Sequence, residues 1–491
     1  MSTLNVTNFL VDADSKIIDC LNVINKNEKG IAFVCRDGKL LGSISDGDIR
    51  RALISGFTLE SEVLEIENLY PIYGTVSESP SELQLKLQHG IEYLPVISKE
   101  GLLVKILTKD FLDFIPLAKP SLTQRESELV NEVMASGWIS SVGAYVGEFE
   151  EKFANFIGSE HAVAVSNGTQ AIALALYAHS IGLGDEVIVP ALTFGATVNA
   201  VIQVGATPVF IDVELDTHAI DVTQIRNLVT KNTKAILVVH LYGQSARLKE
   251  ILSIAKDLNL LVIEDCAEAI GTYCEDFHVG SKSDAGTFSF FANKSITTGE
   301  GGMVTFNSRR IAERARTIRS HGFNSNNRYW HEEWGTNMRL TNLQAAIGVA
   351  QMERIDWLLA SRKRVAQEYK ENIQRLELEN IVLPTEFAWS TNSHWLFTLR
   401  VLNSKNIQSL VDHFMSNRIE ARRIFSPLPG QPAFSKYNTQ HSKFPVAQEI
   451  FDSGICLPTF ADLSSQSVKR ISMVLGEFFS KKNVEWSSPL K

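Results

Sequence analysis

Several residues that could do chemistry follow short apolar runs, at the places where buried strands would end. Lys294 comes after the run Thr287–Phe291 and before the glycine-rich turn TTGEGG, and Asp265 lies near the end of the run LLVIEDC. The segment 166–169, SNGT, links another apolar run to a helical stretch. Taken singly, each has a common structural explanation: a surface lysine, a helix N-cap, or an ordinary turn between a strand and a helix.

Together, these groups match what transamination on pyridoxal 5'-phosphate (PLP) requires of a protein. A lysine must hold the cofactor as a Schiff base, a carboxylate must keep the pyridine nitrogen protonated, donors must hold the phosphate, and a flat group must stack on the ring. Lys294 and Asp265 are the candidates for the first two roles. Gly168 allows close approach of the backbone at a helix start that can bind phosphate. Ser289 could add a hydroxyl donor and Phe194 could stack on the ring, although a core position is the alternative for Phe194.

The elements that must position these residues can be predicted from the pattern after residue 116. Apolar runs such as HAVAVS, EVIVP, KAILVVH and LLVIEDC alternate with helical stretches. This alternation predicts an α/β fold with a mostly parallel, buried sheet, in which ligands bind at the carboxyl ends of the strands. From about residue 361 the pattern is more mixed and predicts a smaller α+β domain. We therefore expect a large cofactor-binding domain at 117–360 and a small C-terminal domain at 361–491.

Residues 1–116 have a different pattern, with two similar units of short strands and helices. The unit LLGSISDGDIRRAL resembles a CBS domain, in which a Ser and an Asp three residues later, here Ser45 and Asp48, hold the ribose and phosphate of a nucleotide. In the second unit Phe111 stands where the acid is expected, and the acid lies earlier, at Asp110. We expect a CBS-domain pair with at most one regulatory nucleotide site. The alternative is a module that only packs or oligomerises.

The chain from about 117 to 485 resembles the DegT/DnrJ/EryC1/StrS family of sugar aminotransferases. The resemblance rests on the motifs SNGTQAI, PALTFGATVNA, VHLYGQ, VIEDCAEAIG, FSFFANKSITTGEGGM and TNMRLTNLQAAIGVAQ. It implies the type I fold of PLP-dependent aminotransferases and a homodimer, or a dimer-based oligomer, with a shared active site. The residue roles that it implies are the Schiff-base lysine Lys294, the pyridinium partner Asp265, phosphate contacts from Gly168, Thr169, Ser289 and the partner's Asn337, ring stacking by Phe194, a place near the cofactor hydroxyl for Glu268, and substrate binding by Arg422.

Within the family, EDCAEA, SFFANKSITTGEGG and RYWHEEWG are most similar to the branch that makes GDP-perosamine. That branch transfers the amino group of L-glutamate to carbon 4 of GDP-4-keto-6-deoxy-D-mannose, for surface polysaccharides such as O-antigen. The chain departs from the family pattern at Ala292, Thr336 and Pro429. Pro429 lies near the expected sugar pocket, so this departure concerns the substrate rather than the reaction.

Three alternatives to this function stay open at this stage. The first is an aminotransferase for another keto sugar, acting at carbon 3 or on a UDP or TDP carrier. The second is a sugar dehydratase of the same fold, which would carry a His in place of Lys294. The third is a CBS-regulated, non-catalytic protein that binds PLP. The lysine argues against the dehydratase, and the intact pair of Lys294 and Asp265 argues against the non-catalytic regulator.

Composition limits the other classes of function. The chain has 491 residues, a net charge of −9 and 21% charged residues, which argues against a nucleic-acid-binding or membrane-surface protein. Its five cysteines form no CxxC pair, so we expect neither a disulfide framework nor a metal site. The first residues lack the pattern of a signal peptide, and no long apolar stretch occurs, so we expect a cytoplasmic protein.

Overall fold

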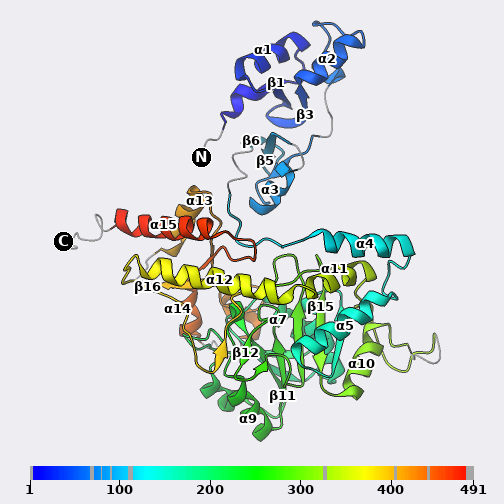
Figure 1. Ribbon diagram of the computed structural model, residues 1–491, viewed down its shortest axis with the longest axis vertical. Coiled ribbons are helices and arrows are strands. Elements are labelled where there is room, and N and C mark those ends of the chain that lie inside the picture. The colour runs from blue at the N-terminus through cyan, green and yellow to red at the C-terminus, as the bar shows by residue number, and fades with distance from the viewer. Residues whose placement is uncertain are drawn as a thin grey trace. The chain divides into compact units, whose positions relative to one another are not determined.

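The computed structural model describes residues 4–66, 71–78, 80–88, 91–108, 114–323, 329–402, 406–438 and 443–482. The chain divides into two compact units, which are drawn in Figure 1. The first consists of Met1–Pro116 together with Met415–Glu420, and the second of Leu117–Phe414 together with Ala421–Lys491.

The first unit contains two small sheets with the same topology. In each sheet the first strand is parallel to the second and the second is antiparallel to the third, and each antiparallel pair has a bulge near its turn. This likeness supports the internal repeat predicted from the sequence. The elements are β1 (Leu10–Asp12), α1 (Ile17–Asn27), β2 (Ile31–Arg36), β3 (Lys39–Ser45), α2 (Asp46–Ile54), β4 (Gly74–Thr75), α3 (Pro80–Gln88), β5 (Tyr93–Ile97) and β6 (Leu103–Thr108).

The short segment Met415–Glu420 belongs to the first unit because it pairs with the end of the N-terminal module. Ile115 forms a parallel bridge with Ile419, and its backbone N–H donates to the carbonyl of Arg418 at 2.9 Å. The backbone N–H of Glu420 in turn donates to the carbonyl of Ile115 at 2.8 Å. Both isoleucines are buried, at 8% and 0% exposure, so the pairing keeps two apolar side chains out of water.

The second unit is built on a seven-stranded sheet with the order β7-β15-β14-β11-β10-β8-β9. All neighbours are parallel except β15, which runs antiparallel to both of its partners. The mostly parallel α/β sheet predicted from the sequence is therefore confirmed. The strands are β7 (His161–Val165), β8 (Glu186–Pro190), β9 (Thr207–Ile211), β10 (Thr233–Val239), β11 (Leu261–Asp265), β14 (Ala285–Ser289) and β15 (Gly302–Phe306).

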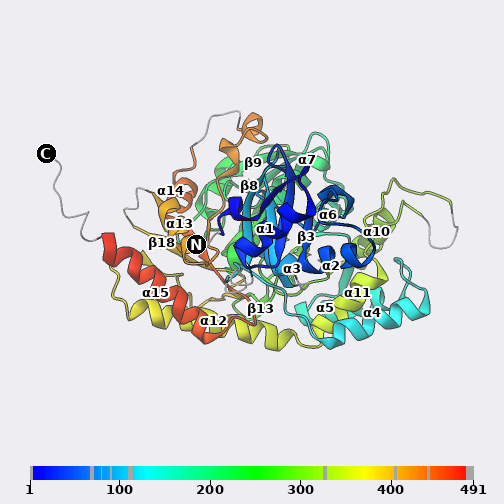
Figure 2. The same ribbon diagram turned by 90° about the horizontal axis from the view of Figure 1, so that it is seen from above.

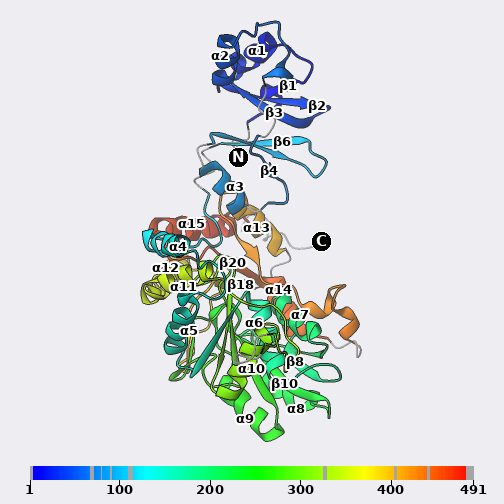
Figure 3. The same ribbon diagram turned by 90° about the vertical axis from the view of Figure 1, so that its right-hand side faces the viewer.

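Helices cover both faces of this sheet, which is why its strands are apolar throughout rather than alternating. Successive residues of β10 enter opposite cores: Leu237 packs into one, and Ile236 and Val238 into the other. Figure 3 shows the two layers, with α6 and α7 on one side and α5 on the other. The helices are α4 (Gln124–Ser136), α5 (Ala144–Ile157), α6 (Gly168–Ala178), α7 (Gly195–Gln203), α8 (Ile225–Leu228), α9 (Leu248–Leu258), α10 (Arg309–Arg319) and α11 (Asn342–Met352).

The C-terminal part of the second unit contains a four-stranded antiparallel sheet with the order β16-β18-β20-β19. Helices α12 and α15 run side by side in this part (Figure 2). Since α12 is continuous through residues 360 and 361, the predicted domain boundary falls inside a helix. The elements are α12 (Ile355–Gln374), β16 (Ile381–Val382), β18 (Phe397–Val401), α13 (Ile407–Ser416), β19 (Arg422–Arg423), α14 (Pro445–Ser453), β20 (Gly454–Leu457) and α15 (Ser465–Lys482), with a further small sheet of β12 (Tyr273–Cys274), β13 (Phe277–His278) and β17 (Ser390–Thr391).

The cysteines and the helix lengths bear on the expectations drawn from composition. All five cysteines are unpaired and buried. In the part of the chain that the structure describes, no helix combines the length and apolar character that a membrane crossing requires.

Candidate active site

A pocket of about 600 Å³ lies where several strands of the large sheet end. Its wall brings together residues that are up to 339 positions apart in the chain, from Leu117 to Cys456. It contains all but one of the residues predicted for the cofactor and substrate, namely Gly168, Thr169, Phe194, Asp265, Glu268, Ser289, Lys294 and Arg422.

Lys294 follows β14 in a tight turn, and its backbone N–H donates to the carbonyl of Phe291 at 2.9 Å. The side chain is only 13% exposed, and Nζ lies 3.5 Å from Oε1 of Glu268. On another side, Nζ lies 4.0 Å from the ring centroid of Trp395. The ammonium group is therefore held between a carboxylate and an aromatic ring, which excludes the surface-lysine alternative.

Trp395 and Arg362 hold this lysine in place, and neither was predicted from the sequence. The indole Nε1 of Trp395 donates to the carbonyl of Asn293 at 2.8 Å. The buried guanidinium of Arg362 donates to the carbonyls of Trp395 at 2.9 Å and Lys294 at 3.4 Å. A buried guanidinium that binds several carbonyls fixes the chain segments to which they belong.

Asp265 is the last residue of β11 and is fixed by two hydrogen bonds. Thr197 Oγ1 donates to its Oδ2 at 2.8 Å, and the backbone N–H of Ala267 donates to its Oδ1 at 3.1 Å. Burial raises the pKa of Asp265, while these hydrogen bonds and the charge of Lys294 oppose the shift. The residues directly after Asp265 form turns, so the helix-cap alternative is wrong.

Glu268 is buried beside Lys294 and is positioned by an unusual backbone conformation at Tyr242. The backbone N–H of Tyr242, whose φ is 54°, donates to Glu268 Oε2 at 2.9 Å. Burial raises the pKa of Glu268, and the nearby charge of Lys294 opposes this shift. The Tyr242 ring lies parallel to that of Trp395, with 6.1 Å between the centroids. These contacts connect Glu268 and Trp395 on either side of the lysine.

The start of α6 forms another part of the pocket wall. Asn167 caps this helix by accepting the backbone N–H of Gln170 at 2.9 Å. A Cβ at Gly168 would lie 2.8 Å from Cβ of Ser289, so glycine is required for this approach. The first N–H groups of a helix have no partner within the helix and favour an anion. The Gly168–Ser289 cradle therefore fits a phosphate group.

Phe194 and Arg422 also line the pocket. Phe194 is 60% exposed although it is apolar, and its ring centroid lies 5.7 Å from that of Phe425. It lines the pocket rather than the core, so the core alternative is wrong. Arg422 lies in β19 beside Arg423, and both line the same pocket.

Asn337 is the predicted cofactor residue that does not line this pocket. It is exposed, and its Oδ1 accepts a hydrogen bond from Nε of Arg339 at 2.9 Å. Its predicted role in the site of a partner subunit stays a prediction.

In the first unit, Ser45 and Asp48 form a reciprocal capping box at the start of α2. Ser45 donates to Asp48 Oδ2 from its backbone N–H at 2.8 Å and from its hydroxyl at 2.6 Å. Arg51 Nη2 binds the other carboxylate oxygen at 2.5 Å. These contacts give both residues a structural role, and their nucleotide-binding role stays a prediction. Asp110 and Phe111 of the second repeat lie outside the described residues.

His240, Glu264 and Cys266 form a buried group whose ligand atoms all lie within 4.8 Å of one another. His240 Nε2 is 2.8 Å from Glu264 Oε2, and its Nδ1 accepts the backbone N–H of Ala246 at 3.1 Å. Both ring nitrogens are therefore engaged, and neither has a lone pair available for a metal ion. The group is better described as a hydrogen-bonded cluster next to Asp265, whose carbonyl accepts the backbone N–H of His240 at 3.1 Å.

Comparisons with known proteins extend these observations. Residues 120–475 match the DegT/DnrJ/EryC1/StrS aminotransferase family, and residues 4–55 match the CBS domain. The GDP-perosamine synthase of Escherichia coli O157:H7 is 41% identical over 371 residues, covering 76% of this chain and 100% of that protein. The enzyme of the same name from Caulobacter vibrioides is 42% identical over 366 residues, covering 74% and 98%.

Solved structures agree with these sequence matches. The aminotransferase from Psychrobacter cryohalolentis superposes with a TM-score of 0.70 at 31% identity, covering 74% of this chain and 98% of that one. DesV from S. venezuelae, described in complex with a ketimine intermediate, gives a TM-score of 0.68 at 30% identity, covering 72% and 94%. The matched region in each case includes most of the second unit.

Proposed function

Because the chain belongs to the DegT/DnrJ/EryC1/StrS aminotransferase family, we propose that it transfers the amino group of L-glutamate to a nucleotide-linked 4-keto-6-deoxy sugar with PLP as cofactor. The sugar we propose is GDP-4-keto-6-deoxy-D-mannose, and the product is GDP-perosamine for a surface polysaccharide. The observation that carries the reaction is the convergence of Lys294, Asp265 and the Gly168–Ser289 cradle on one pocket. The names of the E. coli and Caulobacter relatives support the choice of sugar.

The donors of the pocket fit PLP at three separate points. The cradle at Gly168 and Ser289, with Thr169, would hold the phosphate. Asp265, buried and held by Thr197, would accept a hydrogen bond from a protonated pyridine nitrogen. Phe194 would stack on the ring, and Glu268 would lie near its hydroxyl. When bound, PLP supplies an electron sink that makes the hydrogen on the amino-bearing carbon acidic.

Lys294 would both attach the cofactor and move the proton in each half of the reaction. The Nζ atom needs a defined position when it is not attached, so that it can take the proton from one carbon and return it at another. Glu268 Oε1 at 3.5 Å and the Trp395 ring at 4.0 Å supply that position. The buried carboxylate of Asp265 needs no movement during the cycle, since its role is to hold a positive charge opposite itself.

Arg422 is the proposed partner for a carboxylate or phosphate of the substrates, because a guanidinium can bind either with two hydrogen bonds. Asn337 is proposed to reach the phosphate site of a second subunit, which makes a homodimer the functional unit. The division into a CBS pair at 1–116, a large domain at 117–360 and a small domain at 361–491 stays part of this proposal.

The N-terminal module is proposed to bind a regulatory nucleotide at Ser45 and Asp48. The support is the CBS match over residues 4–55 and the start of α2, which favours phosphate. Binding would require the nucleotide to displace part of the capping box that these two side chains form with each other. Regulation would further require different affinities for two states of the enzyme.

A substrate panel tests the main proposal. The purified chain is incubated with glutamate, PLP and GDP-, UDP- or TDP-linked keto sugars, and release of 2-oxoglutarate and formation of the amino sugar are measured. We expect the GDP-linked 4-keto-6-deoxy sugar to give the highest kcat/KM. A preference for a UDP or TDP sugar would support the alternative substrate, and no release with any sugar would contradict the aminotransferase proposal.

A further inference from the structure

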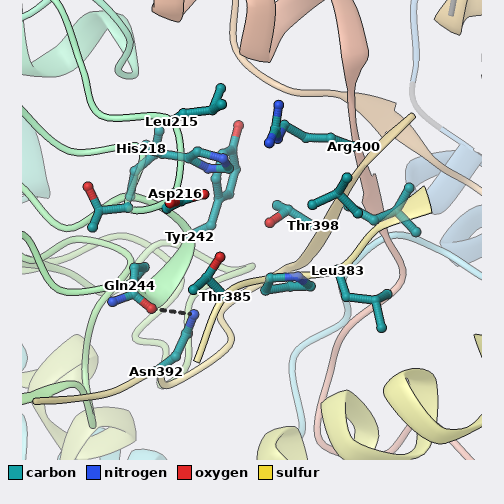
Figure 4. A pocket seen from close by; sticks show the side chains of 15 residues that line it. Leu215, Asp216, His218, Tyr242, Gln244, Leu383, Thr385, Asn392, Thr398 and Arg400 are labelled. Atoms are coloured by element: carbon teal, nitrogen blue, oxygen red, sulfur yellow. Dashed lines mark hydrogen bonds between the residues drawn. The ribbon is translucent and has the colours of Figure 1, made fainter. Parts of the chain in front are cut away.

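A second, smaller hollow in the same unit shares a wall with the candidate active site. Leu241 and Tyr242 line both cavities. The remaining wall comes from the loop that contains Asp216 and His218, from the segment 382–385, and from β18. Figure 4 shows Arg400, Thr398 and Thr385 facing His218 and Tyr242 across this hollow.

Arg400 brings a positive charge to the hollow. Its side chain is only 9% exposed, and Nη1 lies 3.2 Å from Oε1 of Glu449, a carboxylate that is 54% exposed. Within the described part of the chain, the other guanidinium nitrogens donate to no protein oxygen at hydrogen-bond distance. An arginine buried to this extent normally has its fork of donors engaged. The remaining donors of Arg400 are therefore available to a ligand.

Two hydroxyls and an imidazole add uncharged polar groups. Among the described residues, the side chains of Thr385, Thr398 and His218 have no hydrogen-bond partner, although Thr398 is buried. Burial and the nearby charge of Arg400 lower the pKa of His218 to about 4, so its ring is neutral at pH 7. His218 has a φ of 58°, a left-handed conformation that is uncommon for a residue with a side chain. This backbone conformation thus places the neutral imidazole of His218, with its N–H donor, in the hollow.

The size and the lining of the hollow limit the ligand. Its volume is about 30 Å³, which is room for roughly two water-sized particles. Asp216 is exposed and lines the hollow, where its carboxylate disfavours ligands that carry more than one negative charge. These limits favour a small ligand with one negative charge over phosphate, sulfate or a whole amino acid.

We propose that this hollow binds a small monovalent anion of the size of chloride or formate, held by Arg400 and by the hydroxyls of Thr385 and Thr398. The neutral ring of His218 completes the site. His218 packs edge-to-face against Tyr242, with 6.5 Å between the ring centroids, and the backbone of Tyr242 holds Glu268 of the active site. The anion therefore stabilises the wall that the two cavities share.

The full chain, loaded with PLP, is titrated with sodium chloride against sodium gluconate at constant ionic strength while Tm is measured. Chloride at ten times its Kd is expected to raise Tm by about 2 °C. Formate is expected to act like chloride, and sulfate is not. Arg400→Gln and the nearly isosteric Thr398→Val should lose most of the response. Arg364→Gln is the matched control, since Arg364 pairs with Glu368 on α12 outside the hollow and should respond as the unmodified chain does.

Bromide locates the anion directly. Crystals grown in sodium bromide are expected to show an anomalous peak between Arg400 and Thr398 that is absent in Thr398→Val. If Arg400→Gln fails to fold, Thr398→Val alone decides the question. The proposal is overturned if the unmodified chain shows no response specific to chloride, if Thr398→Val responds fully, or if no bromide peak occurs in the hollow. None of these outcomes depends on the identity of the sugar substrate.

Discussion

Thr197 Oγ1 donates a 2.8 Å hydrogen bond to Oδ2 of Asp265, across 68 positions of the chain. This bond favours the ionised form of a carboxylate whose pKa is raised by burial. The form in which Asp265 can hold a protonated pyridine nitrogen is the ionised one. Thr197 is therefore a positioning residue for the proposed electron sink.

Thr197→Val should reduce kcat by about tenfold, since one hydrogen bond to a charged group contributes roughly 1.5–3 kcal/mol. Loss of the donor raises the pKa of Asp265 further, so activity should disappear at a higher pH on the acid side of the profile. The control is Thr233→Val, a buried threonine that begins β10, whereas the pocket is lined by Val239 at the other end of that strand. Asp265→Asn removes the carboxylate itself and sets the upper limit of the loss in kcat, which we expect to be several orders of magnitude. An unchanged pH profile for Thr197→Val would contradict this role.

Lys294→Ala should abolish turnover and leave a folded protein. The change removes both the attachment point and the proton carrier, while the backbone of the turn is still held by the carbonyl of Phe291 and the guanidinium of Arg362. The measurements are 2-oxoglutarate release, the visible absorbance of bound PLP and circular dichroism. Substantial transaminase activity in this variant would remove the central claim.

Trp395→Phe should retain more activity than Trp395→Leu. Phenylalanine keeps a ring against Nζ of Lys294 but loses the hydrogen bond to the carbonyl of Asn293, whereas leucine loses both. A cation–π contact in a partly buried site is worth about 1–2 kcal/mol, so we expect kcat to be roughly tenfold lower for leucine than for phenylalanine. Quenching of tryptophan fluorescence by PLP should be weaker in both variants. Equal kcat values for the two would assign Trp395 a packing role only.

A mixture of Lys294→Ala and Asn337→Ala chains should recover part of the activity that each lacks alone. If Asn337 serves the partner's phosphate site, a mixed dimer has one site with both residues intact. The chains are denatured together, refolded with PLP and assayed, with each variant refolded alone as the control. Complete inactivity of the mixture, at full recovery of folded dimer, would argue against a shared site.

The residues that sequence could predict lie at the end of a strand or within a few positions after it. Lys294 and Ser289 belong to β14 and its turn, and Asp265 to β11, so local pattern and family resemblance together place them. Thr197, Trp395 and Arg362 could not be found in this way, because their roles depend on contacts between distant segments. Trp395 is separated by 101 positions from Lys294, and its surroundings read as an ordinary strand. Ser45 and Asp48 differ from these residues. Their local pattern predicts a nucleotide site, but the capping box that they form gives the same pattern a structural explanation.

The N-terminal module should be removable only up to the residues that pair with Arg418 and Glu420. A chain that begins at Phe114 keeps the pairing of Ile115 with Arg418 and Glu420, and should bind PLP and retain basal activity. A chain that begins at Lys119 loses both of those hydrogen bonds and exposes Ile419, which is otherwise fully buried. It also loses Leu117, whose carbonyl accepts the backbone N–H of Thr459 at 2.8 Å and whose side chain lines the pocket.

Exposing a buried isoleucine costs about 1.5–3 kcal/mol, so the shorter chain should unfold at lower temperature than the longer one. Glu420 lies two residues before Arg422. In the chain that begins at Lys119, KM for the substrates should therefore rise more than kcat falls. Both chains are compared by thermal unfolding, PLP titration and steady-state kinetics, with the full chain as reference. Equal Tm and KM values for the two shortened chains would show that the pairing at Ile115 supports neither stability nor the pocket.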